Sequence, residues 1–184
     1  GCQNVYGYDF SPERPVGLPA EIGYFGSERE LIDSGQKFNT IRMNHVIEHL
    51  VDYSSTFTTL SEILKPGGTI FGQTPNAGHY SSGVMGKRWG NLHYPYHTLL
   101  FSERGMSAFA SRLDLRLEGT EKTMMPTGWA MGLENIVKAV FGWKFIGRTP
   151  IYTLCIFCAA PISIFERFAP FCRSNIFNFS LRKP

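Results

Sequence analysis

Two histidines and a glutamate lie close together in the middle of the chain, where their side chains could move protons or hold a metal. His45, Glu48 and His49 form the pattern H-x-x-E-H, which one class of zinc hydrolase presents on a helix. That chemistry needs both histidines on one helical face, with the glutamate as the base. A strand-like run leads directly into His45, so a zinc hydrolase is only a distant alternative and we expect no metal here.

The segments around these residues must position them. The pattern predicts a strand over Phe38–Asn44, a helix capped by Asp52 and ended by the Pro-Gly-Gly turn at 66–68, and a second strand over Thr69–Thr74. Such a strand–helix–strand unit has parallel strands and a right-handed crossover. Ligands bind at the carboxyl ends of parallel strands. Asn44 and His45 stand at one such end, so we expect a binding crevice there.

The segment from His45 to Asn76, HVIEHL…LSEILKPGGTIFGQTPN, resembles the middle of a class I S-adenosylmethionine (SAM)-dependent methyltransferase. The resemblance implies an α/β fold with a Rossmann-like, mostly parallel sheet and an antiparallel last strand. It also implies SAM as the cofactor, and methyl transfer to an O, N or C acceptor. The acceptor itself is not specified.

The start of the chain resembles the same family. Asn4–Glu13 contains V-x-G-x-D-x-S-P-E, and in the family this Asp holds the ribose of SAM. Further on, Glu21–Ser27 is a candidate third strand and Glu28–Ser34 a short helix. The resemblance implies six cofactor-binding residues: Asp9, Ser11, Ser27, Asn44, His45 and Glu48.

The family places a glycine-rich turn about 20 residues before this Asp, where backbone N–H groups bind the methionine part of SAM. Only eight residues precede Asp9. We therefore expect a chain truncated at its N-terminus, which lacks the first strand and has a gap in the middle of the sheet.

Three histidines are candidates for the catalytic base. The sulfonium of SAM already activates the methyl group, so the protein must align the acceptor and remove its proton. His45 and His49 lie at the crevice, and His97 lies in a later loop. Alternatively, Glu48 and His49 only order the loop. Quinone-biosynthesis O-methyltransferases carry a similar E-V-I-E-H that can hold a divalent metal, but His45 replaces the first Glu.

The second half of the chain is predicted from turns, caps and alternation. Ala77–Leu100 reads as a loop that either lines a substrate pocket or packs at the surface. Ser102 is placed to cap a helix. Leu115–Lys122 and Asn175–Arg182 read as two strands, and the resemblance implies that they pair at the sheet edge.

An apolar insertion separates those last two strands. We divide the chain into a core at 1–123, an insertion at 124–173 and a final strand at 174–184. Thr149–Phe165 carries no charge, but Pro150 and Pro161 interrupt it, and a spanning helix needs about 20 apolar residues. We expect a helical cap, or an interfacial segment that touches a membrane through 133–173. Cys155 and Cys158 are expected to be buried helical cysteines rather than a metal pair.

Composition limits the class of protein. The chain has 184 residues, of which 43% are hydrophobic and 18% charged, as in a globular domain. A net charge of +3 gives no reason to expect a nucleic-acid partner. With no signal-peptide pattern, we expect a cytoplasmic protein, peripheral at the inner face of a membrane. The expected partner is a small-molecule or lipid-linked methyl acceptor. The alternative is a degenerate methyltransferase fold that serves as a membrane- or partner-binding module.

Overall fold

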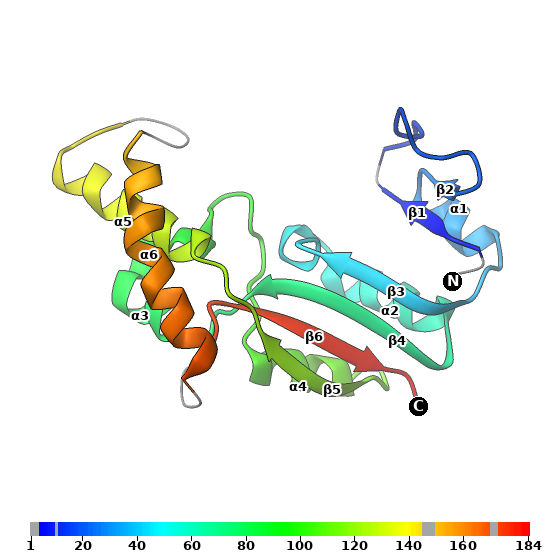
Figure 1. Ribbon diagram of the computed structural model, residues 1–184. Helices are drawn as coiled ribbons and strands as arrows, with labels where there is room; N and C mark the ends of the chain where they lie inside the picture. The colour runs from blue at the N-terminus through cyan, green and yellow to red at the C-terminus, as the bar shows by residue number, and fades with distance from the viewer. Residues whose placement is uncertain (1–3, 10, 145–149, 170–172) are drawn as a thin grey trace.

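The strands form two separate sheets in the computed structural model, which describes residues 4–9, 11–144, 150–169 and 173–184 (Figure 1). A small parallel pair, β1 and β2, stands apart from a four-stranded sheet of order β3-β4-β6-β5. The separation agrees with the predicted gap in the sheet. The strand bounds are Tyr6–Tyr8 (β1), Gly23–Phe25 (β2), Phe38–Asn44 (β3), Leu64–Pro75 (β4), Arg116–Lys122 (β5) and Ile176–Arg182 (β6).

The predicted strand–helix–strand unit is present. β3 and β4 are parallel neighbours, joined through helix α2 (Tyr53–Ile63). The Asp52 carboxylate accepts a hydrogen bond from the backbone N–H of Ser55, as an N-cap does. β4 begins at Leu64 and not at Thr69, because Leu64 already pairs with Phe38 before an irregularity in the ladder.

The last two strands pair with each other as predicted, but not both at the sheet edge. β6 is antiparallel to β4 on one side and to β5 on the other. β6 therefore lies inside the sheet and β5 forms the edge. An antiparallel strand next to an otherwise parallel pair is the mixed sheet that the sequence predicted.

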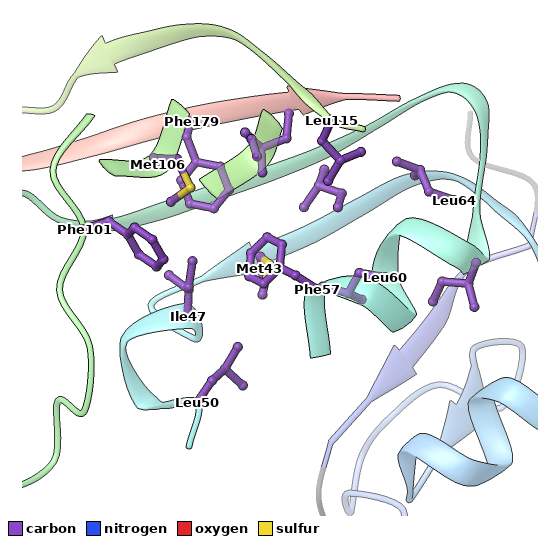
Figure 2. Close-up of a cluster of buried hydrophobic side chains, with 14 of the residues drawn as sticks. Met43, Ile47, Leu50, Phe57, Leu60, Leu64, Phe101, Met106, Leu115 and Phe179 are labelled. Atoms are coloured by element: carbon purple, nitrogen blue, oxygen red, sulfur yellow. The ribbon is translucent and has the colours of Figure 1, made fainter. Parts of the chain in front are cut away.

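Helices α2 and α4 (Glu103–Ser111) cover one face of the four-stranded sheet and bury its main core. Figure 2 shows Phe57 and Leu60 of α2 beside Met43 of β3, with Met106 of α4 against Phe179 of β6. Ser102 caps α4 as predicted, because its hydroxyl accepts from the N–H of Gly105. The predicted short helix after β2 is α1 (Glu28–Asp33).

Residues 77–100 are more ordered than the predicted loop. They contain helix α3 (Tyr80–Met85) and two short 3₁₀ turns, η2 (Gly86–Arg88) and η3 (Gly90–Leu92). Trp89 is buried and packs with Met85 in a second core, away from the sheet. Of the two interpretations of this segment, packing describes Trp89 in this structure. The sequence left packing as one of two alternatives, but without a regular apolar repeat it did not predict the helix α3.

The predicted insertion contains two helices, α5 (Thr127–Val140) and α6 (Ile151–Phe168), which we call the helical cap. Pro150 precedes α6 and Pro161 lies inside it, so the expectation that prolines interrupt this segment was wrong. Within the described residues, α6 is a helix long and apolar enough to cross a membrane, judged by length and composition alone. Cys155 is buried as expected, whereas Cys158 is exposed.

Candidate active site

His45 ends the first strand of the site and turns the chain sharply. Its φ is +52°, in the left-handed region, and its N–H donates to the carbonyl of Gln73 on β4 (2.8 Å). The ring lies between two acceptors, with Nδ1 3.0 Å from Glu48 Oε1 and Nε2 2.8 Å from Gln73 Oε1. Gln73 presents its oxygen because its amide nitrogen donates to Asn178 Oδ1 (2.7 Å). The hydrogen bond to Glu48 raises the pKa of His45, and both ring nitrogens are engaged as donors.

Glu48 is the buried centre of this cluster, with none of its side chain exposed. It belongs to the 3₁₀ turn η1 (Ile47–His49), and its Oε2 accepts from the hydroxyl of Thr74 (3.1 Å). Burial by itself would raise the pKa of Glu48, but the hydrogen bonds from His45 and Thr74 outweigh it and hold the pKa below its usual range. An ion pair therefore joins the carboxyl ends of β3 and β4.

His49 and His97 form a second pair beside Glu48. Their rings pack edge to face, with centroids 4.8 Å apart. Nδ1 of His49 donates to the carbonyl of Tyr96 (3.0 Å), and Nδ1 of His97 donates to the carbonyl of Asn91 (2.7 Å). These bonds leave Nε2 of each ring as the nitrogen with a lone pair. Burial lowers the pKa of His97, so this ring is neutral at neutral pH.

The segment that carries His97 is fastened to the turn that carries Glu48. Thr98 donates its N–H to the carbonyl of Glu48 (2.8 Å) and its hydroxyl to the carbonyl of Leu50 (2.7 Å). His97, 48 residues after His49, is thereby held at the carboxyl ends of the strands. The structure thus brings all three predicted candidate bases, His45, His49 and His97, to one place.

The same group has the donors of a metal site but not the geometry of a zinc hydrolase. Ligand atoms of Glu48, His49 and His97 lie within 4.8 Å of one another, a spacing that a cation could bridge. His45 follows a strand and His49 ends a 3₁₀ turn. The single helical face that H-x-x-E-H requires is therefore not formed among residues 44–50, and the zinc-hydrolase alternative loses its structural basis.

Three of the predicted cofactor-binding residues, Asp9, Ser11 and Ser27, lie just after the strands of the smaller sheet. Asp9 is exposed at the end of β1, and its N–H donates to the carbonyl of Phe25 (3.3 Å). The hydroxyl of Ser11 donates to the carbonyl of Glu13 (3.4 Å), whereas that of Ser27 caps α1. Among the described residues, no hydrogen bond joins this group to Glu48. The arrows of β1, β3 and β4 nevertheless point the same way (Figure 1), so their carboxyl ends face the same side.

Asn44, one of the predicted cofactor-binding residues, stands exposed at the end of β3. Two other residues of the cluster were not predicted. Gln73 and Asn178 orient His45, although no sequence motif singled them out. Only the alternation of F-N-F-S-L in the last strand hinted that Asn178 faces away from the buried core.

Comparisons with known proteins agree with this arrangement. Residues 1–118 match a family model described as "Methyltransferase domain". A search of curated proteins by sequence found no match.

Among solved structures, the chain is similar to "StiE O-MT residues 961-1257", with 14% identity and a TM-score of 0.52 over 98% of this chain and 59% of that one. It is also similar to mycolic acid cyclopropane synthase CmaA1 complexed with SAH and CTAB (14% identity, TM-score 0.54, 98% and 70% covered). A third match is a complex of the Haloferax volcanii Trm112 methyltransferase activator with a methyltransferase (16%, TM-score 0.58, 98% and 72% covered). At such identities these likenesses show the fold, and the chain spans less than two thirds of the StiE structure.

Proposed function

The chain belongs to the methyltransferase domain family, and from that premise we propose that the protein transfers a methyl group from SAM to an acceptor. Its sheet is Rossmann-like, with the antiparallel strand β6 beside a parallel pair. The observation that carries the proposal is the buried Glu48, held by His45 and Thr74 where two parallel strands end. This is the place where open α/β sheets bind nucleoside ligands.

We assign the ribose of SAM to Asp9, as the resemblance implies. A carboxylate at the end of a strand accepts hydrogen bonds from both ribose hydroxyls. Ser11, Ser27 and Asn44 then lie toward the nucleoside. The ion pair of His45 with Glu48 fixes the loop that the cofactor would contact.

Among the three histidines, the geometry favours His97 or His49 over His45 as the base. Both nitrogens of His45 donate to neighbouring oxygens, which leaves no lone pair to take a proton. His97 is neutral, and its Nδ1 bond to a backbone carbonyl leaves Nε2 to accept one. We therefore assign proton removal to His97, with His49 packed against it.

The acceptor class that we propose is apolar or lipid-linked. The cap next to the histidine cluster carries large apolar side chains on its surface, among them Phe157 and Phe168. Trp129 of α5 and Glu166 of α6 contact His79 and Tyr80, which begin four residues after β4 ends. An acceptor held at the cap would therefore reach the carboxyl ends of the strands.

A transfer assay tests the function. The full-length protein is incubated with SAM labelled on the methyl group and with a lipid extract or, in parallel, an aqueous extract of cells. We expect label in the lipid extract, and a rate on the order of 100-fold lower for His97→Asn because general-base catalysis is lost. Since burial lowers the pKa of His97, the wild-type rate is expected to reach half its maximum below pH about 6.5.

The control is Glu118→Gln, on the exposed side of β5, which is expected to keep the wild-type rate. Transfer only into the aqueous extract would refute the lipid-linked acceptor. An unchanged rate for H97N would refute the assigned base. Absence of transfer into both extracts, in a protein that also fails to bind SAM, would favour the degenerate binding module instead.

A further inference from the structure

Helix α6 of the cap buries small or polar side chains and exposes large apolar ones. Its fully buried positions recur at intervals of three and four residues and carry small or polar side chains: Cys155, Ala159, Ser163 and Glu166. Its exposed positions carry large apolar ones instead: Leu154, Phe157, Ile164, Phe165 and Phe168. A helix that only completed a water-soluble core would show the opposite pattern.

The exposed stripe is extensive. Phe157 is 71% exposed and Phe168 is 78% exposed. A groove of about 820 Å³ runs along this face, and it is lined only by apolar residues, Phe165 and Pro161 among them. A contiguous apolar surface on a soluble domain marks a place where another molecule binds.

The exposed charges in the last third of the chain, from Lys122 onward, have one sign. From Lys122 to the end of the chain, the acidic residues are Glu134 and Glu166, and both are buried. Exposed charges in the described parts of this stretch include the cations Lys144, Arg167 and Arg173. The Arg167 guanidinium lies 6.0 Å from the ring centroid of Phe168. The outer surface of the cap therefore combines apolar and cationic groups.

We propose that the outer face of α6 lies in the interface of an anionic lipid bilayer, with the helix parallel to the membrane surface. Amphipathic helices with aromatic and basic side chains bind in this way, through apolar burial and attraction to anionic headgroups. The cationic long side chains reach back to the headgroups while the rings enter the acyl boundary.

A spanning orientation fits less well. The 18 residues of α6 measure about 27 Å at 1.5 Å per residue, short of the roughly 30 Å hydrocarbon core. Its inner stripe is also committed to protein, because Glu166 accepts hydrogen bonds from Tyr80 of α3 and Trp129 of α5. A spanning α6 would carry this charged residue into the bilayer.

A second copy of the chain fits the outer face of α6 less well than anionic lipid does. A two-fold contact places each patch on itself, so that Arg167 would approach its own copy, and α6 itself exposes no acid to meet it. Anionic lipid supplies the missing negative charge. Docking itself does not depend on the proposed function, but with that function it would bring the site to a lipid-linked acceptor.

Vesicle co-sedimentation of the full chain tests the docking. We expect binding to vesicles that contain 30% phosphatidylglycerol, much weaker binding to pure phosphatidylcholine, and release as salt rises. The double variant F157S/F168S is expected to bind the anionic vesicles at least tenfold more weakly. The matched control V16S/V51S replaces exposed apolar residues elsewhere and is expected to bind like the wild type.

A fluorophore on Cys158 reports whether the face enters the lipid. Cys158 is exposed on α6, whereas Cys155 is buried and its burial raises the pKa of the thiol, which keeps it unreactive. Cys2 and Cys172 are replaced by serine in this variant. We expect a blue shift of the emission with anionic vesicles and none with neutral vesicles.

Three results would overturn the proposal. The first is wild-type protein that stays in the supernatant with anionic vesicles. The second is a dimer in sedimentation velocity that F157S/F168S abolishes, without vesicle binding, because this would identify a second copy as the occupant. The third is extraction from cell membranes only by detergent and not by alkaline carbonate, which would indicate a spanning helix. SAM binding, measured on the same preparations, separates these failures from a failure of the enzymatic proposal.

Discussion

Two buried glutamates, one in each half of the molecule, have similar partners and different surroundings. Glu48 pairs with His45 and accepts from the hydroxyl of Thr74. Glu166 Oε1 lies 3.1 Å from Nε2 of His79, a close contact without the alignment of a hydrogen bond. It accepts from the hydroxyl of Tyr80 (2.7 Å) and from the indole N–H of Trp129 (2.9 Å).

The difference lies in the histidines. The side chain of His45 is 40% exposed, whereas that of His79 is fully buried. The first cluster therefore opens to the end of the sheet, where a ligand can reach it. The cluster around Glu166 joins α3, α5 and α6 into one unit, and its burial gives a ligand no access to it. Similar polar chemistry thus forms an accessible cluster, the candidate site, in one half and a buried structural anchor in the other.

Removing the anchor is expected to have the largest effect on stability. Glu166→Ala removes the acceptor that the hydroxyl of Tyr80 and the buried indole N–H of Trp129 share, and it removes the carboxylate beside the buried ring of His79. We expect a loss of about 3 kcal/mol or more in the free energy of unfolding, as for other broken buried pairs. Urea unfolding followed by tryptophan fluorescence measures it. Glu118→Gln, at an exposed pair, is expected to cost less than about 1 kcal/mol. If E166A also lost less than about 1 kcal/mol, the buried Glu166 cluster would stabilise the fold no more than the exposed pair of Glu118 does.

Removing the Glu48 carboxylate is expected to lower the free energy of unfolding by less than Glu166→Ala does. The size of this loss is expected to depend on pH. Glu48→Gln loses a charged hydrogen-bond partner, which is worth about 1–3 kcal/mol. The pKa of Glu48 is lowered by folding, so its contribution is present above the unfolded pKa and is lost as pH falls through the folded one. The pKa of His45 is raised, so its contribution is present below about pH 6.5 and is lost as pH rises through the folded pKa.

The difference in unfolding free energy between wild type and E48Q should therefore be largest from about pH 4.5 to 6.5. Denaturant unfolding across pH 4–8 measures it. A difference that does not change with pH would show that His45 and Glu48 are not paired as ions.

The sheet half could be predicted because its local signals agree with its packing. Asp52 caps α2 as predicted, and Phe57 and Leu60 of that helix pack in the core. The start of β4 could not be placed, because the pairing of Leu64 with Phe38 depends on register and not on composition.

The cap could not be predicted in the same way. α3 is fixed by His79 and Tyr80, whose partner Glu166 lies more than 80 residues further along the chain. Pro161 removes one helical hydrogen bond but does not end α6, which is held on both sides of it by packing at Cys155 and Glu166. Contacts between residues so far apart along the chain leave no pattern in the local sequence.

Calorimetric titration of S-adenosylhomocysteine into the full-length protein tests the central claim most directly. The account predicts one site per chain, at least tenfold weaker binding for Asp9→Asn, and unchanged binding for the surface control Asp33→Asn. It also predicts unchanged binding for F157S/F168S, because the cap face is separate from the cofactor site. A folded wild-type protein that shows no binding at millimolar ligand would contradict the assignment of this sheet as a SAM site.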